Sequence, residues 1–260
     1  MDFEIIDFHT HPFLAEKENI CSHKDNYHIT AESTVTYMKN LGVSKICGSV
    51  VRGKKGEETY WDAISACNES ALKLWEMYGD FYVPGFHVHP DYVKESCEEI
   101  EKMHSLGVKL VGELVPYYHG WKDYSLKSFY EILDVAKSYN MIVNFHSTGE
   151  DEMDKMVAEN PDVIFVAAHP GEKPQFDRHM ERMKMSKNYY LDLSGTGLFR
   201  LGMLRHAIDL FGAERFLYGS DFPTCNPAMY VGGVLFDSFI TDKEKEMIFS
   251  KNAKRLLNIK

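Results

Sequence analysis

Short apolar, β-branched runs alternate with longer amphipathic segments along the whole chain, and this alternation constrains the fold more than any other feature. The eight runs predicted to be strands are Glu4–Phe8, Lys45–Val51, Phe81–His87, Val108–Leu114, Met141–Phe145, Val163–Ala168, Tyr189–Leu193 and Phe216–Tyr218. Helical spacing of apolar residues is found in Thr30–Leu41, Glu57–Tyr78, Tyr92–Ser105, Leu126–Tyr139, Glu150–Glu159, Gln175–Lys184, Leu198–Phe211 and Asp242–Leu257. Eight strand–helix units without a Ser/Gly-rich linker predict one domain, a (β/α)8 barrel over residues 1–260.

The positions of the polar residues favour a closed barrel over an open, doubly wound sheet. Polar side chains follow nearly every predicted strand at its carboxyl end. An open sheet would concentrate them at one crevice, whereas a barrel arranges them around one face. We therefore expect a functional site at the carboxyl end of the barrel, built from residues that lie far apart in the sequence.

The first predicted strand leads into two histidines, His9 and His11. Side chains at positions i and i+2 leave the same face of a strand, so the two imidazoles are expected to converge on one point. Two imidazoles at one point suit a divalent metal ion, although a short buried strand whose histidines bind backbone groups would show the same spacing. Pro12 cannot continue a ladder, which places the pair where the strand gives way to a loop.

Further histidines and carboxylates lie at or near the ends of other strands. His146 and His169 directly follow two successive predicted strands. This shared placement favours one common site over two separate core histidines that hydrogen-bond within the core. Asp221 follows the last strand and would either join this site or act as the N-cap of the next helix. Glu113 lies in an apolar strand, where a carboxylate must be paired or metal-bound. It would either bridge two metal ions or pair with Lys109 on the same strand face.

Four residues are candidates for contacts with a substrate. Arg52 follows the second strand and would either clamp a carboxylate or phosphate or remain a solvated loop residue. His87 belongs to a second His-x-His-Pro sequence, for which a substrate-binding or structural role is favoured over metal ligation. Tyr117 and Trp121 lie in an aromatic loop after the fourth strand and are expected to form a wall of the pocket.

Charge and cysteine content limit the partners. The 39 acidic and 29 basic residues give a formal charge of −10, which disfavours binding to nucleic acid but not to a small anionic substrate. Five scattered cysteines, none in a Cys-x-x-Cys pair, indicate reduced thiols and a cytoplasmic location. The acidic start of the chain and the lack of a long apolar run argue against a secretion signal and a membrane span. The apolar stretch Tyr230–Phe239 suggests the contact surface of a homodimer.

As an ordered set, these motifs resemble the amidohydrolase superfamily of metal-dependent barrel hydrolases, and most closely its amidohydrolase 2 branch, which includes decarboxylases of aromatic and muconate-semialdehyde acids. The resemblance is carried by Ile6-Asp7-Phe8-His9-Thr10-His11, Ala168-His169-Pro170-Gly171, Tyr218-Gly219-Ser220-Asp221-Phe222-Pro223 and Asn252-Ala253-Lys254-Arg255-Leu256-Leu257. It implies that a metal ion is bound by His9, His11, His146 and Asp221, with His169 near the substrate or on a second ion. Glu113 departs from the mononuclear pattern and is similar to the strand-4 glutamate of binuclear TatD-type nucleases and phosphotriesterase relatives.

The residues and the resemblance together predict an enzyme with one or two divalent metal ions. Zn²⁺ is expected from the mixed nitrogen and oxygen ligands, with Mn²⁺ or Fe²⁺ as alternatives. The expected reaction is hydrolysis of a small-molecule ester, amide or lactone by a metal-activated water, in which Asp221 transfers protons and His169 stabilises an oxyanion. The alternatives are non-oxidative decarboxylation of a small aromatic or dienoic acid, a binuclear phosphoesterase, and a metal-stabilised binding module without turnover. Fold and metal site do not identify the substrate.

Overall fold

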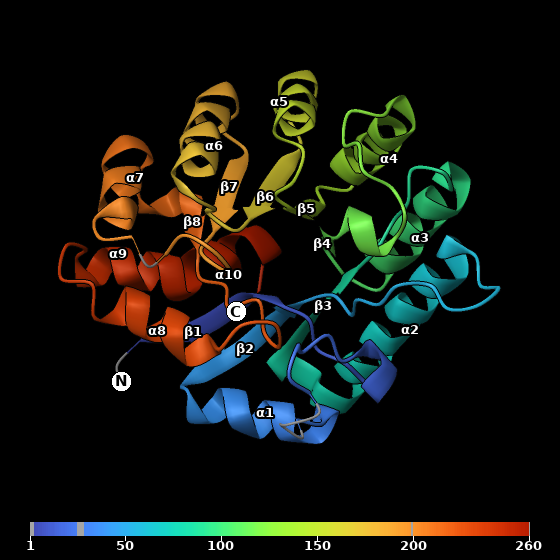
Figure 1. Ribbon diagram of the computed structural model, residues 1–260, viewed down its shortest axis with the longest axis horizontal. Helices are drawn as coiled ribbons and strands as arrows, with labels where there is room; N and C mark the ends of the chain where they lie inside the picture. Colours follow the sequence, from blue (N-terminus) through green and yellow to red (C-terminus); the bar gives the residue numbers. More distant parts are fainter. Residues whose placement is uncertain (1–2, 25–28, 199, 260) are drawn as a thin grey trace.

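The computed structural model describes residues 3–24, 29–198 and 200–259, and in it eight strands form a ring surrounded by helices (Figure 1). Each strand pairs in parallel with the next one along the chain. The strands are β1 (Ile5–Thr10), β2 (Val43–Gly48), β3 (Tyr82–Phe86), β4 (Leu110–Leu114), β5 (Ile142–His146), β6 (Ile164–Ala168), β7 (Tyr189–Asp192) and β8 (Phe216–Leu217).

Backbone hydrogen bonds close the ring between β1 and the segment that follows β8. The amide of Phe8 donates to the carbonyl of Tyr218 at 2.9 Å, and the amide of Asp221 donates to the carbonyl of His9 at 2.8 Å. The (β/α)8 barrel predicted from the sequence is therefore confirmed. Closure also places the end of β1 directly beside the residues after β8, although most of the chain separates them in sequence.

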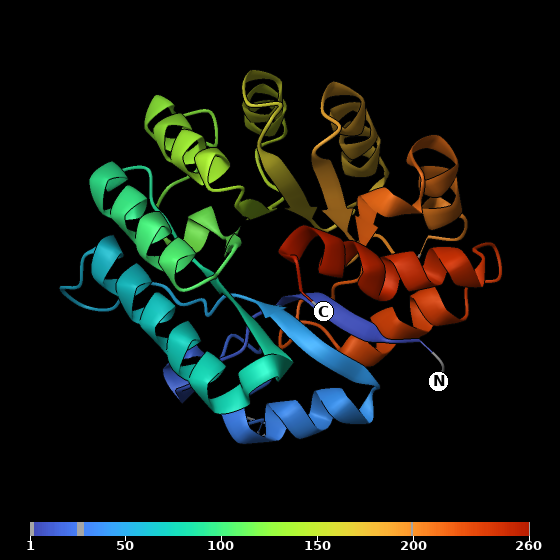
Figure 2. The same ribbon diagram turned by 180° about the vertical axis from the view of Figure 1, so that it is seen from behind.

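The helices lie outside the strands and in most cases match the predicted segments (Figures 1 and 2). They are α1 (Ala31–Asn40), α2 (Tyr60–Tyr78), α3 (Val93–Ser105), α4 (Lys127–Ser138), α5 (Glu150–Glu159), α6 (Lys173–Met185), α7 (Met203–Phe211), α8 (Pro227–Leu235), α9 (Asp242–Glu246) and α10 (Asn252–Leu257). The predicted helix 198–211 begins only at Met203, after the left-handed Gly202. A π-helical turn, η5 (Met247–Lys251), interrupts the predicted final helix.

Helix α8 was not predicted, because its sequence lacks a polar face. Asn226 caps the helix by accepting a hydrogen bond from the amide of Ala228 at 3.0 Å, and Pro227 occupies its first turn. Val231 and Val234 are buried, while Met229 on the same helix is 71% exposed. Apolar residues therefore occupy both the inner and the outer face, and no helical period is visible in the sequence.

A separate apolar cluster takes residues from strands around the ring and joins them to the end of the chain. Its members include Ile6, Cys47, Leu110, Ile142, Val166 and Leu217 from the strands and Ala253 and Leu257 from α10. Ile6, Leu110 and Ile142 lie at or next to the amino ends of their strands. The C-terminal helices, red in Figure 2, thus cover the amino end of the barrel. The polar residues after the strands lie at the opposite, carboxyl end of the barrel.

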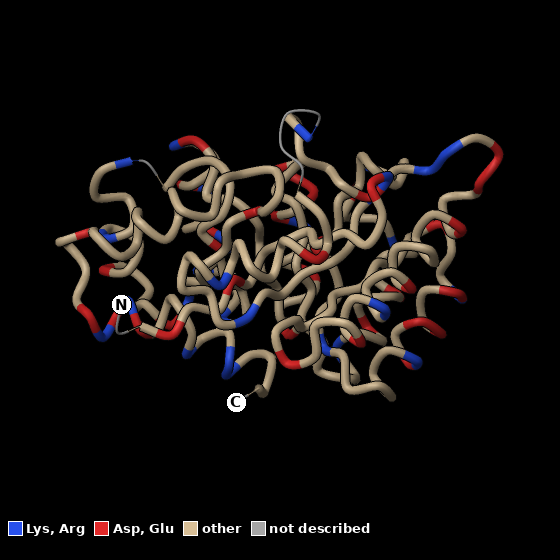
Figure 3. Tube along the Cα trace, turned by 90° about the horizontal axis from the view of Figure 1, so that it is seen from below, with Lys and Arg blue, Asp and Glu red and all other residues tan. Residues whose placement is uncertain are grey.

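The surface carries charges of both signs, with lysine and arginine interspersed with aspartate and glutamate along the trace (Figure 3). All five cysteines are free thiols in this structure. Within the part of the chain that the structure describes, no helix combines the length and the hydropathy needed to cross a bilayer.

Candidate metal centre

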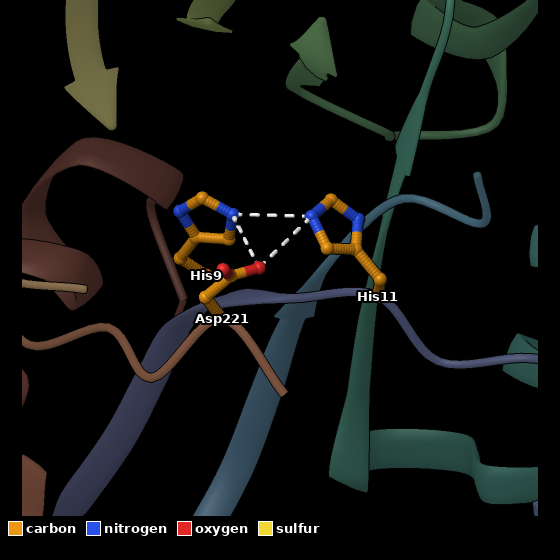
Figure 4. A group of neighbouring side chains, drawn as sticks. All are labelled: His9, His11 and Asp221. Atoms are coloured by element: carbon orange, nitrogen blue, oxygen red, sulfur yellow. Dashed lines mark hydrogen bonds and ion pairs between the residues drawn. The ribbon is translucent and has the colours of Figure 1, made fainter. Parts of the chain in front are cut away.

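The imidazoles of His9 and His11 face one another at the carboxyl end of β1, with Asp221 beside them (Figure 4). Their Nε2 atoms are 3.2 Å apart. His9 Nδ1 lies 2.9 Å from the Asp192 carboxylate, and His11 Nδ1 lies 3.1 Å from the Ser49 carbonyl oxygen. Both partners accept hydrogen bonds, so each Nδ1 carries the proton and each Nε2 presents a lone pair. Two lone pairs at this distance repel one another unless a cation lies between them.

Two carboxylates add further acceptors to the same point. Glu113 Oε2 lies 3.1 Å from His11 Nε2 and 3.3 Å from His9 Nε2, and Asp221 Oδ1 lies 3.5 and 3.8 Å from the same two nitrogens. All of these groups are buried or nearly so, with Asp221 the most exposed at 9%. Four acceptors facing one point with no donor among them fit a divalent cation.

The electrostatics of the site favour positive charge at this position. Burial opposes a charge on His9, but the carboxylates of Asp192 and Glu113 outweigh it and raise the pKa of His9 well above its usual value. Burial likewise disfavours the ionised form of Glu113, yet the facing His9 and His146 rings hold the pKa of that carboxyl well below its usual value. A bound cation would take the place that a proton takes on His9 in its absence.

Glu113 also faces a second pair of histidines with its other oxygen. Its Oε1 lies 3.1 Å from His146 Nδ1 and 3.6 Å from His169 Nε2. These two ring nitrogens are themselves 3.2 Å apart. Glu113 therefore contacts two groups of metal-ligating atoms, one at each carboxylate oxygen. This is the arrangement of a carboxylate that bridges two cations, and the alternative pairing with Lys109 is not what the structure shows.

Two glycines beside the site have no space for a side chain of their own. Gly112, before Glu113, has a φ of +95°, and a Cβ there would lie 2.1 Å from the carbonyl oxygen of Asn144. A Cβ on Gly195 would lie 2.3 Å from His169 Nδ1. His169 and Asp221 themselves have φ values of +68° and +60°, which non-glycine residues rarely adopt outside functional positions.

Asp192 and Ser194 also belong to the site, and the sequence analysis missed both. Asp192 is fully buried and binds His9, and its other oxygen lies 2.5 Å from Ser194 Oγ. Burial raises the pKa of Asp192, but His9 outweighs that effect and lowers it. The available signal was the one used for Glu113, a carboxylate inside an apolar strand.

A cavity of about 510 Å³ opens beside these groups. His146, His169 and Asp221 line it together with Tyr117, which is 59% exposed and packs edge-on against His146 at 5.3 Å between ring centroids. Tyr117 thus lies where the sequence predicted a pocket wall. Asp221 faces the histidine pair on one side and the cavity on the other, which leaves a small molecule access to this point.

The structure does not bring three other predicted residues to this cavity. The guanidinium of Arg52 donates to the carboxylate of Glu58 at 2.7 and 3.1 Å. His87 is fully buried and donates from Nε2 to the carbonyl of Val50 at 2.8 Å. Trp121 packs against aromatic side chains of its own loop and of α4. A position at a strand end indicates which end of the barrel a residue lies at, but not whether its side chain turns inward.

Comparisons with known proteins relate this barrel to solved enzymes. The family model described as amidohydrolase matches residues 6–259. A search of curated protein sequences gives no match. A 2,6-dihydroxybenzoate decarboxylase from Rhizobium has a TM-score of 0.76 at 14% identity, and the alignment covers 98% of this chain and 99% of that one.

Two further solved structures share the fold. A dihydroxybenzoic acid decarboxylase from Polaromonas, with bound manganese and the inhibitor 2-nitroresorcinol, has a TM-score of 0.74 at 13% identity, covering 98% of this chain and 97% of that one. A probable 2-pyrone-4,6-dicarboxylic acid hydrolase from Acinetobacter baumannii, with citric acid bound, has a TM-score of 0.63 at 15% identity, covering 99% and 100%. At these identities the likeness concerns the fold.

Proposed function

Because this chain belongs to the amidohydrolase family, we propose that it is a metal-dependent enzyme that hydrolyses an ester, amide or lactone bond of a small molecule. The observation that carries the proposal is the meeting of His9 Nε2, His11 Nε2 and Asp221 Oδ1 with both oxygens of Glu113 beside an open cavity. These residues would hold a divalent ion, Zn²⁺ by the ligand set and Mn²⁺ or Fe²⁺ as alternatives, whose chemistry would be to polarise a substrate carbonyl and to lower the pKa of a water molecule.

Asp221 is the proposed proton carrier. Its Oδ1 faces the histidine pair and the residue lines the cavity, so the carboxylate lies where an attacking water would release a proton. The same carboxyl group would then return the proton to the leaving group.

His169 fits a ligand role better than that of an oxyanion donor. Ser194 Oγ lies 3.0 Å from His169 Nδ1 and gives its own proton to Asp192, so Nδ1 of His169 carries a proton and donates to Ser194. Nε2 then presents a lone pair toward Glu113 and His146. With His146 and the second oxygen of Glu113, it would hold a second cation.

Decarboxylation of a small aromatic or dienoic acid is the second candidate. It is supported by the two decarboxylases among the similar structures, which act on dihydroxybenzoic acids. The same residues would hold a cation, which would bind the substrate carboxylate. The carbon that bears this carboxylate would gain a proton, and the bond between them would break to release carbon dioxide. A binuclear phosphoesterase is a third candidate, and it is supported only by the two-sided contacts of Glu113.

The test is to strip the protein of metal and measure turnover before and after Zn²⁺ or Mn²⁺ is restored. A panel of small esters, amides and lactones reports hydrolysis, and release of carbon dioxide from dihydroxybenzoates reports decarboxylation. We expect metal removal to lower the rate by about 100-fold or more, since Lewis-acid stabilisation is worth several kcal/mol. Equal rates with and without metal would refute the proposal, and a bound-metal count of two per chain would support the bridging role of Glu113.

Asp221→Asn provides the matched variant. It keeps the size of the side chain and one metal-facing oxygen but removes the proton acceptor, so we expect kcat to fall by about 100-fold. The control is Asp134→Asn on the outer face of α4, where the side chain is 67% exposed. An Asp221→Asn enzyme with unchanged kcat would remove Asp221 from the mechanism while leaving metal dependence to be judged separately.

A further inference from the structure

Among the residues that the structure describes, the cavity beside the metal centre has a neutral lining apart from the candidate metal ligands. Its non-ligand lining includes Ser147, Gln175, Thr196, Thr224 and Tyr230, and neither Lys nor Arg lies among the described residues that line it. The segment 25–28, which the structure does not describe, contains no Lys or Arg in the sequence either. Away from the candidate metal ligands, a second anionic group on a substrate would therefore meet only neutral partners among these residues.

Several cationic residues close in sequence to the lining are paired with carboxylates. Arg52 is bound by Glu58. On α6, Lys173 pairs with Asp177, and Arg178 pairs with Asp151 and Asp154. To clamp a substrate, each of these side chains would have to leave a partner of opposite charge.

Several of the lining groups present lone pairs to the cavity because their protons are used elsewhere. The hydroxyl of Ser147 donates to the carbonyl of Ala168, and the hydroxyl of Tyr230 donates to the carbonyl of Gly195 at 2.7 Å. The thiol of Cys225 lies 3.7 Å from Asp221 Oδ2 and donates to it. These oxygen and sulfur atoms can accept hydrogen bonds from a ligand but have no proton left to give to an anion.

From this pattern we propose that the site selects small molecules with one anionic or carbonyl group for the metal centre and a hydroxyl or amino donor at the far end, and rejects those with a second carboxylate. The inference rests on the proposed metal-dependent function. A distal hydroxyl satisfies the acceptors of Ser147 and Tyr230, whereas a distal carboxylate would lose water and face lone pairs. Gln175, Thr196 and Thr224 lie at the exposed rim, where their amide and hydroxyl groups can donate a hydrogen bond but carry no charge to balance a carboxylate.

The test is a binding measurement, independent of turnover, on the zinc-loaded protein with three related probes. Benzoate carries one carboxylate, 3-hydroxybenzoate adds a distal hydroxyl, and isophthalate has a carboxylate in its place. By calorimetric titration we expect 3-hydroxybenzoate to bind about 3- to 10-fold more tightly than benzoate, from one neutral hydrogen bond. Isophthalate should bind at least about 10-fold more weakly than 3-hydroxybenzoate.

A second experiment adds a positive charge to the cavity and asks whether binding of the dicarboxylate improves. Gln175→Arg places a guanidinium at the rim and should improve the affinity for isophthalate by about 10-fold more than the affinity for benzoate. Gln175→Glu is the matched control and should not improve isophthalate binding. Isophthalate binding to the unaltered protein as tightly as 3-hydroxybenzoate would overturn the inference.

The outcomes separate this inference from the proposed function. If none of the three probes binds the zinc-loaded protein, the premise that the metal centre receives an anionic group is wrong and the inference fails with it. Unchanged turnover after metal removal would instead refute the proposed function. Equal affinity for the mono- and dicarboxylate in a protein that does require metal would refute only the charge selection.

Discussion

The hydroxyl of Ser194 lies among three groups of the metal centre. Its Oγ is 2.5 Å from Asp192 Oδ1, 3.0 Å from His9 Nδ1 and 3.0 Å from His169 Nδ1. The hydroxyl has one proton and gives it to the ionised Asp192, so its lone pairs receive the histidine N–H groups. Ser194 thereby fixes the orientation of a histidine from each of the two candidate ligand groups.

Removing this hydroxyl should weaken metal binding without unfolding the protein. We predict that Ser194→Ala lowers the affinity for Zn²⁺ by about 10-fold or more, the usual effect of losing a partner that orients a ligand. Competition with a chromophoric chelator measures the affinity. Ser138→Ala on the exposed side of α4 should leave it unchanged, and an equal affinity for the two variants would contradict the assigned role.

His87, predicted as a substrate residue, is instead a source of pH dependence in stability. Burial lowers the pKa of His87 to about 4, and the neutral ring donates to Val50. An unfolded chain protonates this histidine near pH 6.5, while the folded chain does so only near pH 4. Stability is therefore lost as the pH falls from about 6.5 to about 4, at about 1.4 kcal/mol per pH unit.

The corresponding variant is His87→Gln, which retains a donor for Val50 and does not titrate. Urea unfolding of metal-free protein at pH 7.5 and pH 4.5 gives the free energy of unfolding. We predict that the unaltered protein loses about 2 to 3 kcal/mol more than the variant over this interval. Parallel pH profiles for the two proteins would show that His87 is not buried in its neutral form.

At the scale of elements, β4 depends on a glycine for the position of its carboxylate. The pairing register with β5 shifts between Val111 and Leu114, and Gly112 and Glu113 lie at that irregularity. A regular strand would have placed Lys109, Val111 and Glu113 on one face. The shift instead presents Glu113 to four histidines, which strand alternation by itself does not predict.

A methyl group at Gly112 should disturb both the strand and the metal site. Its Cβ would lie 2.1 Å from a backbone oxygen of β5, which cannot move as a flexible side chain can. We predict that Gly112→Ala lowers the free energy of unfolding by about 2 kcal/mol or more and also weakens Zn²⁺ binding. Gly202→Ala also has a positive φ, +77°, but open space around it, so it should cost about 1 kcal/mol and leave zinc affinity unchanged.

At the scale of the whole molecule, the candidate ligands join strands from opposite parts of the ring. His9 lies in β1 and His11 directly after it, Glu113 lies in β4 and His146 in β5, and Asp221 follows β8. A cation bound among them is absent from the unfolded chain, so its binding free energy adds to the stability of the entire barrel.

Metal binding should therefore be visible in global unfolding. At free Zn²⁺ about 100-fold above its dissociation constant, the stabilisation is about 2.7 kcal/mol, which corresponds to a rise in Tm of about 5 °C for a chain of this size. Thermal unfolding followed by circular dichroism, with and without chelator, measures it. The rise should disappear in His11→Ala, and a Tm that does not respond to zinc in the unaltered protein would count against the site.

How far the sequence predicts this protein differs between the fold and the site. The barrel and all eight strands followed from periodicity, because each unit repeats the same local pattern. Helix α8 did not, since its apolar residues lie on both faces. Asp192 lies in an apolar strand as Glu113 does, but its role depends on its contact with His9, which is distant in sequence.

The sequence by itself determined the architecture and which end of it carries the polar residues, because strand and helix periods are local properties of the chain. It also indicated His9, His11, Glu113, His146, His169 and Asp221, which the structure brings together. Only the tertiary structure decided that Arg52, His87 and Trp121 turn away from the cavity and that Asp192 and Ser194 join the site. Side-chain direction depends on packing and on partners distant in sequence, such as Glu58 for Arg52 across a loop and Asp192 for His9 across the ring.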